Sequence, residues 1–69
     1  MKISARNQFS GTVKLIVNGP VSTEVTVTIG PGIDVVAVIS TTSANSLGLA
    51  TGRPAQVLIK ASSVLVGVE

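Results

Sequence analysis

Hydrophobic and polar residues alternate along much of the chain, and this alternation predicts an all-β fold. The clearest case is residues 21–29 (VSTEVTVTI), where odd positions are apolar and even positions are polar, with Thr23 as the exception. A period of two is typical of a strand that buries one face. Residues 9–17 alternate around Phe9, Val13, Leu15 and Val17, and an Asn-Gly-Pro turn follows at 18–20. The two segments therefore predict a β-hairpin.

The rest of the chain predicts three more strands and one short helix. After a Gly-Pro-Gly turn, residues 33–40 are almost continuously apolar, which is typical of a strand covered on both faces, by a barrel interior and by a subunit contact. Residues 43–47 predict a turn or two of helix, capped by Thr41 or Thr42 and ended by Gly48 in the left-handed conformation. Residues 51–56 predict a loop, and 56–62 and 63–69 predict the fourth and fifth strands.

This order of elements indicates an OB-like, five-stranded Greek-key barrel with one helical turn between strands 3 and 4. An SH3-like barrel is the alternative architecture. No internal repeat and no linker interrupts the pattern, so residues 1–69 are expected to form a single domain.

The composition indicates that the domain needs support beyond its own core. At 69 residues, one hydrophobic core only marginally outweighs the loss of chain entropy. The absence of cysteine and histidine excludes a disulfide framework and a thiolate or imidazole metal site. With 45% hydrophobic and 12% charged residues, the charges are too few to cover every face of a monomer. A homo-oligomer is therefore expected.

The charged residues argue against several function classes. The five basic residues are scattered singly and only Phe9 is aromatic, so neither a basic stripe nor a stacking platform for nucleic acid is present. Without His and Cys, and with Glu24 and Asp34 on separate predicted strands, general acid–base or nucleophilic catalysis is not expected, and both carboxylates are interpreted as solvated. No signal peptide or membrane-spanning run is recognisable, which predicts a cytoplasmic protein with no membrane partner.

Hydrogen-bond donors are what the chain has in abundance. Its serine and threonine hydroxyls, its turn amides, and the cations Arg6 and Lys60 suit a small oxyanion, whose oxygens only accept hydrogen bonds. Each feature has a plainer explanation as well: Arg6 as a solvated charge, Lys60 as the lysine that protects a strand edge, and residues 40–43 as a helix cap. A helix N-terminus also attracts anions, so cap and ligand roles can coincide.

Three motifs together resemble a known family. The opening SARNQ (4–8), the segment ISTTSANSLGL (39–49) and the late KASSV (60–64) are similar to the molbindins, small bacterial Mop-type molybdate-binding proteins. The same domain occurs in the molybdate-responsive transcriptional regulator and in some molybdate transporter ATPases. The similarity extends over the whole chain in the family's order.

The resemblance implies an OB-like barrel whose subunits exchange an N-terminal strand and assemble as a homohexamer, a trimer of dimers. It implies molybdate or tungstate held whole between subunits, with no redox chemistry, no pterin, no other cofactor and no metal cation, for intracellular storage, buffering and homeostasis. The implied oxyanion residues are Ser4, Arg6, Ser40, Ser43, Lys60, Ala61 (through its main chain) and Ser62. A second class of anion site near a threefold axis would involve Gly19, Val21 and Ser22, although Pro20 removes one amide there.

Two other functions remain open at this point. One is an OB-type nucleic-acid-binding module, which the basic pI of about 9.7 allows. The other is a structural or regulatory oligomerisation domain without a working anion site. The meeting of Arg6 with Lys60 rests on the resemblance alone.

Overall fold

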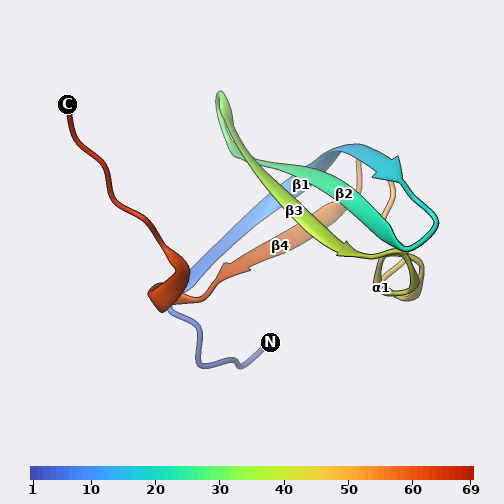
Figure 1. Ribbon diagram of the computed structural model, residues 1–69, viewed down its shortest axis with the longest axis horizontal. Helices are drawn as coiled ribbons and strands as arrows, with labels where there is room; N and C mark the ends of the chain where they lie inside the picture. Colours follow the sequence, from blue (N-terminus) through green and yellow to red (C-terminus); the bar gives the residue numbers. More distant parts are fainter.

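The computed structural model describes residues 1–69 as a curled, antiparallel, four-stranded sheet with a short helix at one end (Figure 1). Strand order in the sheet is β3-β2-β1-β4. The elements in chain order are β1 (Asn7–Asn18), β2 (Ser22–Gly30), β3 (Ile33–Ser40), α1 (Thr41–Ser46), β4 (Pro54–Ile59) and the 3₁₀ turn η1 (Ala61–Ser63). The all-β class and the β1–β2 hairpin are thus confirmed, and no helix is long and apolar enough to cross a membrane.

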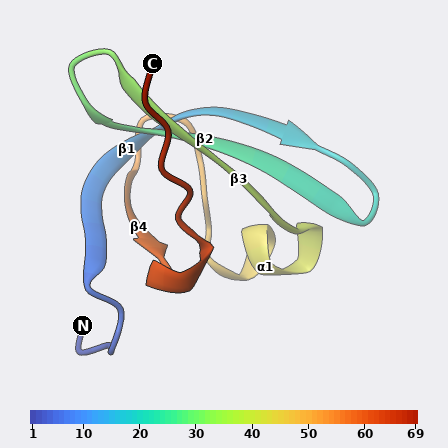
Figure 2. The same cartoon turned by 60° about the vertical axis from the view of Figure 1, so that its left-hand side comes forward.

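Strand β1 is the longest strand, and it changes partner halfway along. Its first half, from Asn7 to Thr12, pairs with β4, and its second half, from Thr12 to Asn18, pairs with β2. Figure 2 shows the resulting curvature of β1. Gly11 lies next to this change of partner, where a Cβ atom would clash with the carbonyl oxygen of Thr28. Glycine is therefore required for the close approach of the strands at this bend.

The core lies on the concave side of the sheet. Val13, Val25 and Val27 are buried there. Around them pack the partly buried Ile16, Ile29, Ile39, Leu49, Ala55 and Val57. The polar exception in the alternating pattern, Thr23, also faces inward and is fully buried. Its hydroxyl is 2.8 Å from that of Thr41, which satisfies the hydrogen bonding of a polar group in the core.

The helix begins one residue earlier than predicted. Ser40 is the N-cap rather than Thr41 or Thr42, because its Oγ accepts a hydrogen bond from the Ser43 N–H at 3.0 Å. Thr41 uses its hydroxyl elsewhere, donating to the Gly19 carbonyl at 2.7 Å. Gly48, with φ of 64°, ends the helical region in the left-handed conformation, as predicted.

The predicted strand over 56–62 is shifted in the structure. β4 starts at Pro54, inside the predicted loop, and ends at Ile59, so Lys60 and the two residues after it leave the sheet. Lys60 is the N-cap of η1, and the Ser63 N–H donates to the Lys60 carbonyl at 2.9 Å. This local hydrogen bond replaces the strand pairing that the Lys-Ala-Ser sequence was expected to continue.

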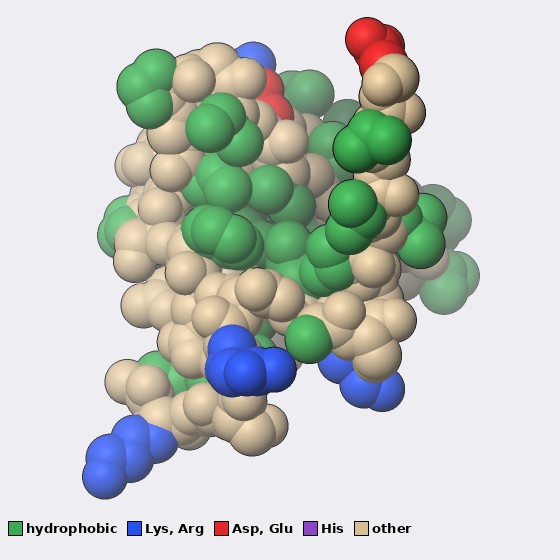
Figure 3. All heavy atoms as spheres, turned by 90° about the vertical axis from the view of Figure 1, so that its left-hand side faces the viewer, with side chains coloured by type: hydrophobic (Ala, Val, Ile, Leu, Met, Phe, Trp, Pro, Cys, Tyr) green, Lys and Arg blue, Asp and Glu red, His purple; other side chains and the backbone are tan.

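Neither the predicted fifth strand nor the two-sided burial of β3 is seen in the single chain. Residues 64–69 are extended but have no strand partner. On the convex side of β3, Val36 is 58% exposed and Val38 is 70% exposed. Figure 3 shows apolar side chains spread over one face of the molecule. The apolar pattern was read correctly, but the surfaces that would cover these residues are not supplied by the same chain.

Candidate functional site

Four of the predicted site residues lie together at one end of the sheet. Ser4, Arg6, Lys60 and Ala61 line a hollow of about 260 Å³. The β1–β4 pairing explains why they meet: Asn7 is the register partner of Ile59, so the residues just before Asn7 lie beside those just after Ile59. The remaining lining residues are Ile3, Ala5 and Leu58. We call this hollow the basic hollow.

The two cations of the basic hollow have no partner in the chain. Neither Arg6 nor Lys60 forms an ion pair or donates a side-chain hydrogen bond, and both are exposed. The backbone beside them is held by amide side chains: Asn7 Nδ2 donates to the Ile59 carbonyl at 3.2 Å, and Gln8 Nε2 donates to the Ala5 carbonyl. The hollow therefore presents two uncompensated positive charges on a fixed backbone, which favours an anion.

The turn η1 adds main-chain donors beside these charges. The N–H groups of Ser63 and Val64 donate to the carbonyls of Lys60 and Ala61, whereas those of Ala61 and Ser62 donate to no acceptor in the chain. Free N–H groups at the start of a helical turn are expected, because the acceptors lie further along the chain. Ala61 can thus contribute through its main chain, and Ser62 lies next to the hollow without lining it.

The other predicted oxyanion residues lie at the opposite end of the sheet. Ser40 and Ser43 are together at the start of α1, where the Ser40 hydroxyl donates to Ser43 Oγ at 2.8 Å and accepts from the Ser43 N–H. These hydroxyls are exposed but already bonded to each other. We call this pair the serine cap.

The turn that was assigned to a second class of site is adjacent to the serine cap. Ser22 is the register partner of Ser40 across β2 and β3. The carbonyls of Gly19 and Val21 are occupied, since they accept hydrogen bonds from the hydroxyl and N–H of Thr41 at 2.7 and 2.8 Å. The N–H groups of Gly19 and Val21 donate to no acceptor in the chain, so N–H donors are what this turn can still offer.

The basic hollow and the serine cap cannot share one anion within one chain. The hollow adjoins Asn7 and the cap adjoins the Asn18 end of β1 (Figure 1). The strand between these two ends spans roughly 30 Å at about 3.3 Å per residue. A tetrahedral oxyanion is far smaller than this separation. The predicted residues therefore form two separate groups in the monomer.

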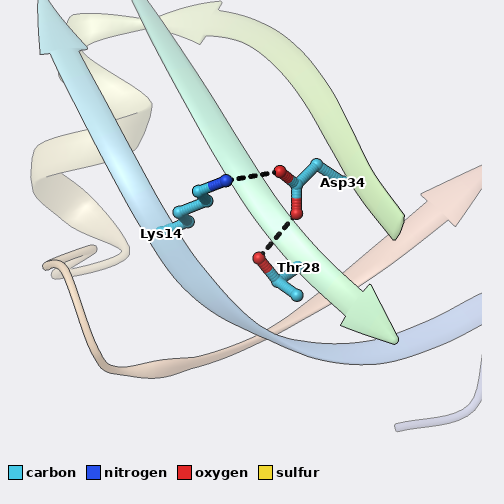
Figure 4. A network of polar contacts seen from close by, with 3 residues as sticks. All are labelled: Lys14, Thr28 and Asp34. Atoms are coloured by element: carbon cyan, nitrogen blue, oxygen red, sulfur yellow. Dashed lines mark hydrogen bonds and ion pairs between the residues drawn. The ribbon is translucent and has the colours of Figure 1, made fainter. Parts of the chain in front are cut away.

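A polar network that the sequence interpretation missed crosses the convex face. Lys14 Nζ lies 2.8 Å from Asp34 Oδ2, and the Thr28 hydroxyl donates to Asp34 Oδ1 at 2.7 Å (Figure 4). The hydrogen bond from Lys14, followed by that from Thr28, lowers the pKa of Asp34 below its ordinary value. Asp34 was interpreted as a solvated carboxylate; it is exposed but paired. The β2–β3 register, which places Thr28 opposite Asp34, was the signal for this network.

The donor set of the chain suits an anion rather than a cation. No three His, Cys, Asp or Glu side chains gather in a group that could hold a metal ion. The unpaired charges are cationic, and the free groups beside them are N–H donors. The fold and this site define a small β-sheet protein whose chemistry is that of oxyanion binding.

Comparisons with known proteins place the chain in a family. Residues 3–66 match the TOBE domain family. The chain is 52% identical over 66 residues to the molybdenum transport protein ModE of Herbaspirillum seropedicae, covering 96% of this chain but only 24% of ModE. It is 46% identical over its full length to a probable molybdenum-pterin-binding protein of Haemophilus influenzae, and it covers all of that protein.

A solved structure agrees with the computed fold. The molybdate-binding protein from Sporomusa ovata superposes with a TM-score of 0.90 at 37% identity, over 99% of this chain and 100% of that one. The chain therefore belongs to the TOBE domain family, and its relatives there are Mop-type molybdenum-pterin-binding proteins. The names of these relatives describe binding and transport, not catalysis.

Proposed function

We propose that this protein binds molybdate as an intact oxyanion, with the basic hollow as the charged part of the site. The observation that carries the proposal is that Arg6 and Lys60 line one hollow without a counter-charge in the chain. Relatives that are named for molybdenum or molybdate cover the whole length of the chain and support the choice of ligand.

The mechanism is the replacement of water around a dianion by charge-assisted hydrogen bonds. An anion that leaves water loses a large hydration energy unless donors and opposite charges replace it. The side chains of Arg6 and Lys60 supply the charge, while the Ser4 hydroxyl and the N–H groups of Ala61 and Ser62 supply neutral donors. Charge-assisted hydrogen bonds are about twice as strong as neutral ones, so the two cations dominate the affinity.

A second copy of the chain completes the site in this proposal. The serine cap, at the far end of β1, can contribute Ser40 and Ser43 to an anion in the basic hollow only when the two groups belong to different copies. An assembly of six chains as a trimer of dimers provides such interfaces. The turn at Gly19, Val21 and Ser22 would supply N–H donors to a further anion near a symmetry axis.

The biological role that follows is storage and buffering of molybdate in the cytoplasm. The oxyanion is bound and released unchanged, so the protein is a reservoir and not an enzyme. Tungstate, with nearly the same size and charge, is expected to bind at the same site.

Calorimetric titration with molybdate, repeated in excess sulfate, tests the proposal. Binding is expected to survive sulfate; competition that abolishes it would reduce the hollow to a general anion site. Lys60→Ala is expected to lose about 10- to 100-fold in affinity, since a hydrogen bond to a charged group contributes about 1.5–3 kcal/mol. Lys14→Ala is the matched control, because Lys14 already pairs with Asp34 away from the hollow. Equal affinity in the native protein and the Lys60 variant would contradict the assignment.

A further inference from the structure

The last six residues form an apolar segment with no partner. Leu65, Val66 and Val68 are 94%, 91% and 95% exposed. A single backbone hydrogen bond, from the Val64 N–H to the Ala61 carbonyl at 3.3 Å, ties this segment to the chain. Figure 1 shows it running clear of the sheet after η1. We call residues 64–69 the C-terminal segment.

The sheet, in turn, has two open edges. The order β3-β2-β1-β4 leaves one side of β3 and one side of β4 without a strand neighbour. Small antiparallel barrels remove such edges by closing, and an open apolar edge otherwise promotes association. One additional strand between β3 and β4 would pair both edges of this curled sheet (Figure 2).

The surface area indicates how much of the chain is meant to be covered. A compact monomer of this mass is expected to expose about 4,000 Å². The chain exposes 5301 Å² and buries only five of its 69 residues. The excess of roughly 1,300 Å² exceeds the ~800 Å² that one partner contributes to a standard protein interface. A second copy is therefore a sufficient occupant for the uncovered apolar surface.

We propose that the C-terminal segment of one copy adds as the fifth strand between β3 and β4 of a second copy, and that the exchange is reciprocal. The segment makes no hydrogen bond to its own sheet and carries no charge before Glu69, so nothing opposes its burial. Reciprocal exchange gives a twofold, closed interface. It would also cover exposed apolar positions on β3 such as Val36.

This assignment changes which end of the chain is exchanged. The family resemblance implied an N-terminal strand, but β1 pairs with its own β2 and β4 from Asn7 to Asn18. The segment left over is the C-terminal one. The inference deepens the oligomeric part of the proposed function, yet it does not depend on the anion.

Cross-linking between single-cysteine variants tests the exchange, and the chain helps because it has no cysteine of its own. Val66→Cys chains are mixed with Val36→Cys chains, refolded together and treated with a short bis-maleimide. A covalent heterodimer is expected in this mixture. In the control mixture, Asn45→Cys on the exposed surface of α1 replaces Val36→Cys, and no heterodimer is expected.

The doubly substituted chain, Val36→Cys with Val66→Cys, separates exchange from self-closure. Cross-linked dimer supports exchange, whereas a product that stays at monomer mass at every protein concentration overturns it. Removal of residues 64–69 is expected to convert the native oligomer to smaller species in native mass spectrometry, while Glu69→Gln leaves it intact. If the truncated chain does not fold, the cysteine variants still decide, since they keep the full chain.

Molybdate titration of the native protein keeps the two proposals apart. Molybdate binding together with only intrachain cross-links would overturn the exchange and leave the proposed function standing. Interchain cross-links without molybdate binding would overturn the proposed function and leave the exchange.

Discussion

The two ends of β1 offer opposite kinds of binding chemistry. At the Asn7 end, Arg6 and Lys60 carry charges with no partner in the chain. At the Asn18 end, the polar groups already bond to one another: Ser40 to Ser43, and the Thr41 hydroxyl to the Gly19 carbonyl. One end is open to a ligand, and the other is largely satisfied before any ligand arrives.

The difference assigns separate physical roles to the two ends. Unpaired cations set affinity for an anion, because charge-assisted hydrogen bonds are the stronger ones. Hydroxyls that already cap a helix mainly stabilise the fold, and they can add only weaker donors to a ligand. A substitution at the basic hollow should therefore change binding with little change in stability, and one at the serine cap should do the reverse.

Gly11→Ala should have the largest effect, because it acts at the bend that places both ends. The new Cβ would meet the Thr28 carbonyl oxygen, and would lie 2.9 Å from Val27 Cγ1. We expect a loss of about 3 kcal/mol in the free energy of unfolding, at the upper end for overpacked sites, measured by urea denaturation. Gly30→Ala is the control, since its nearest contact would be an ordinary 3.5 Å to Ile33 Cδ1. Similar stability of the two variants would mean that the bend does not depend on this close approach.

Ser40→Ala should come next and should affect stability more than binding. It removes the N-cap of α1, which typically costs about 1 kcal/mol in the free energy of unfolding. Its molybdate affinity should fall only several-fold, since a neutral hydrogen bond contributes about 0.5–1.5 kcal/mol. Thermal unfolding and calorimetry on the same sample measure both effects. Ser46→Ala, at the other end of α1 without a side-chain hydrogen bond, is the matched control. An affinity loss as large as that of Lys60→Ala would remove the distinction between the two ends.

The smallest effect should come from the paired lysine, which contrasts with the unpaired Lys60. Because Lys14 and Thr28 lower the pKa of Asp34 in the folded state, the folded chain binds fewer protons than the unfolded one at acidic pH. This contribution to stability is present above the ordinary pKa of 3.8 and is lost as pH falls through the lowered value.

Chemical unfolding across this acidic range measures the effect. Asp34→Asn should flatten the pH dependence of stability, and Thr28→Val, which keeps the ion pair, should flatten it only in part. An unchanged pH profile in Asp34→Asn would show that the pairing on the convex face does not contribute to stability.

Much of this molecule was readable from its sequence. The alternation in residues 9–17 and 21–29 placed the hairpin and its buried face correctly, including Thr23 on the inward side. Gly48 ended the helix as its conformational freedom predicts. These features depend on neighbours in the chain and on side-chain period, which a sequence displays directly.

The site was predicted in composition but not in arrangement. Arg6 and Lys60 were chosen for their chemistry, yet only the register that pairs Asn7 with Ile59 shows that they line the same hollow. The serine cap was chosen for the same ligand, and the same strand geometry places it at the far end of β1. Strand register depends on contacts between residues distant in sequence, so no local motif reports it.

What the sequence determined by itself was the class of fold, the faces of the hairpin strands, and a donor-rich, carboxylate-poor chemistry suited to an oxyanion. What only the tertiary structure decided was which donors share a surface, where β4 gives way to η1, and that the strand-like C-terminal segment finds no partner in its own chain. The physical reason is that a strand is stabilised by the edge beside it, and a sequence specifies the strand's propensity without specifying that edge.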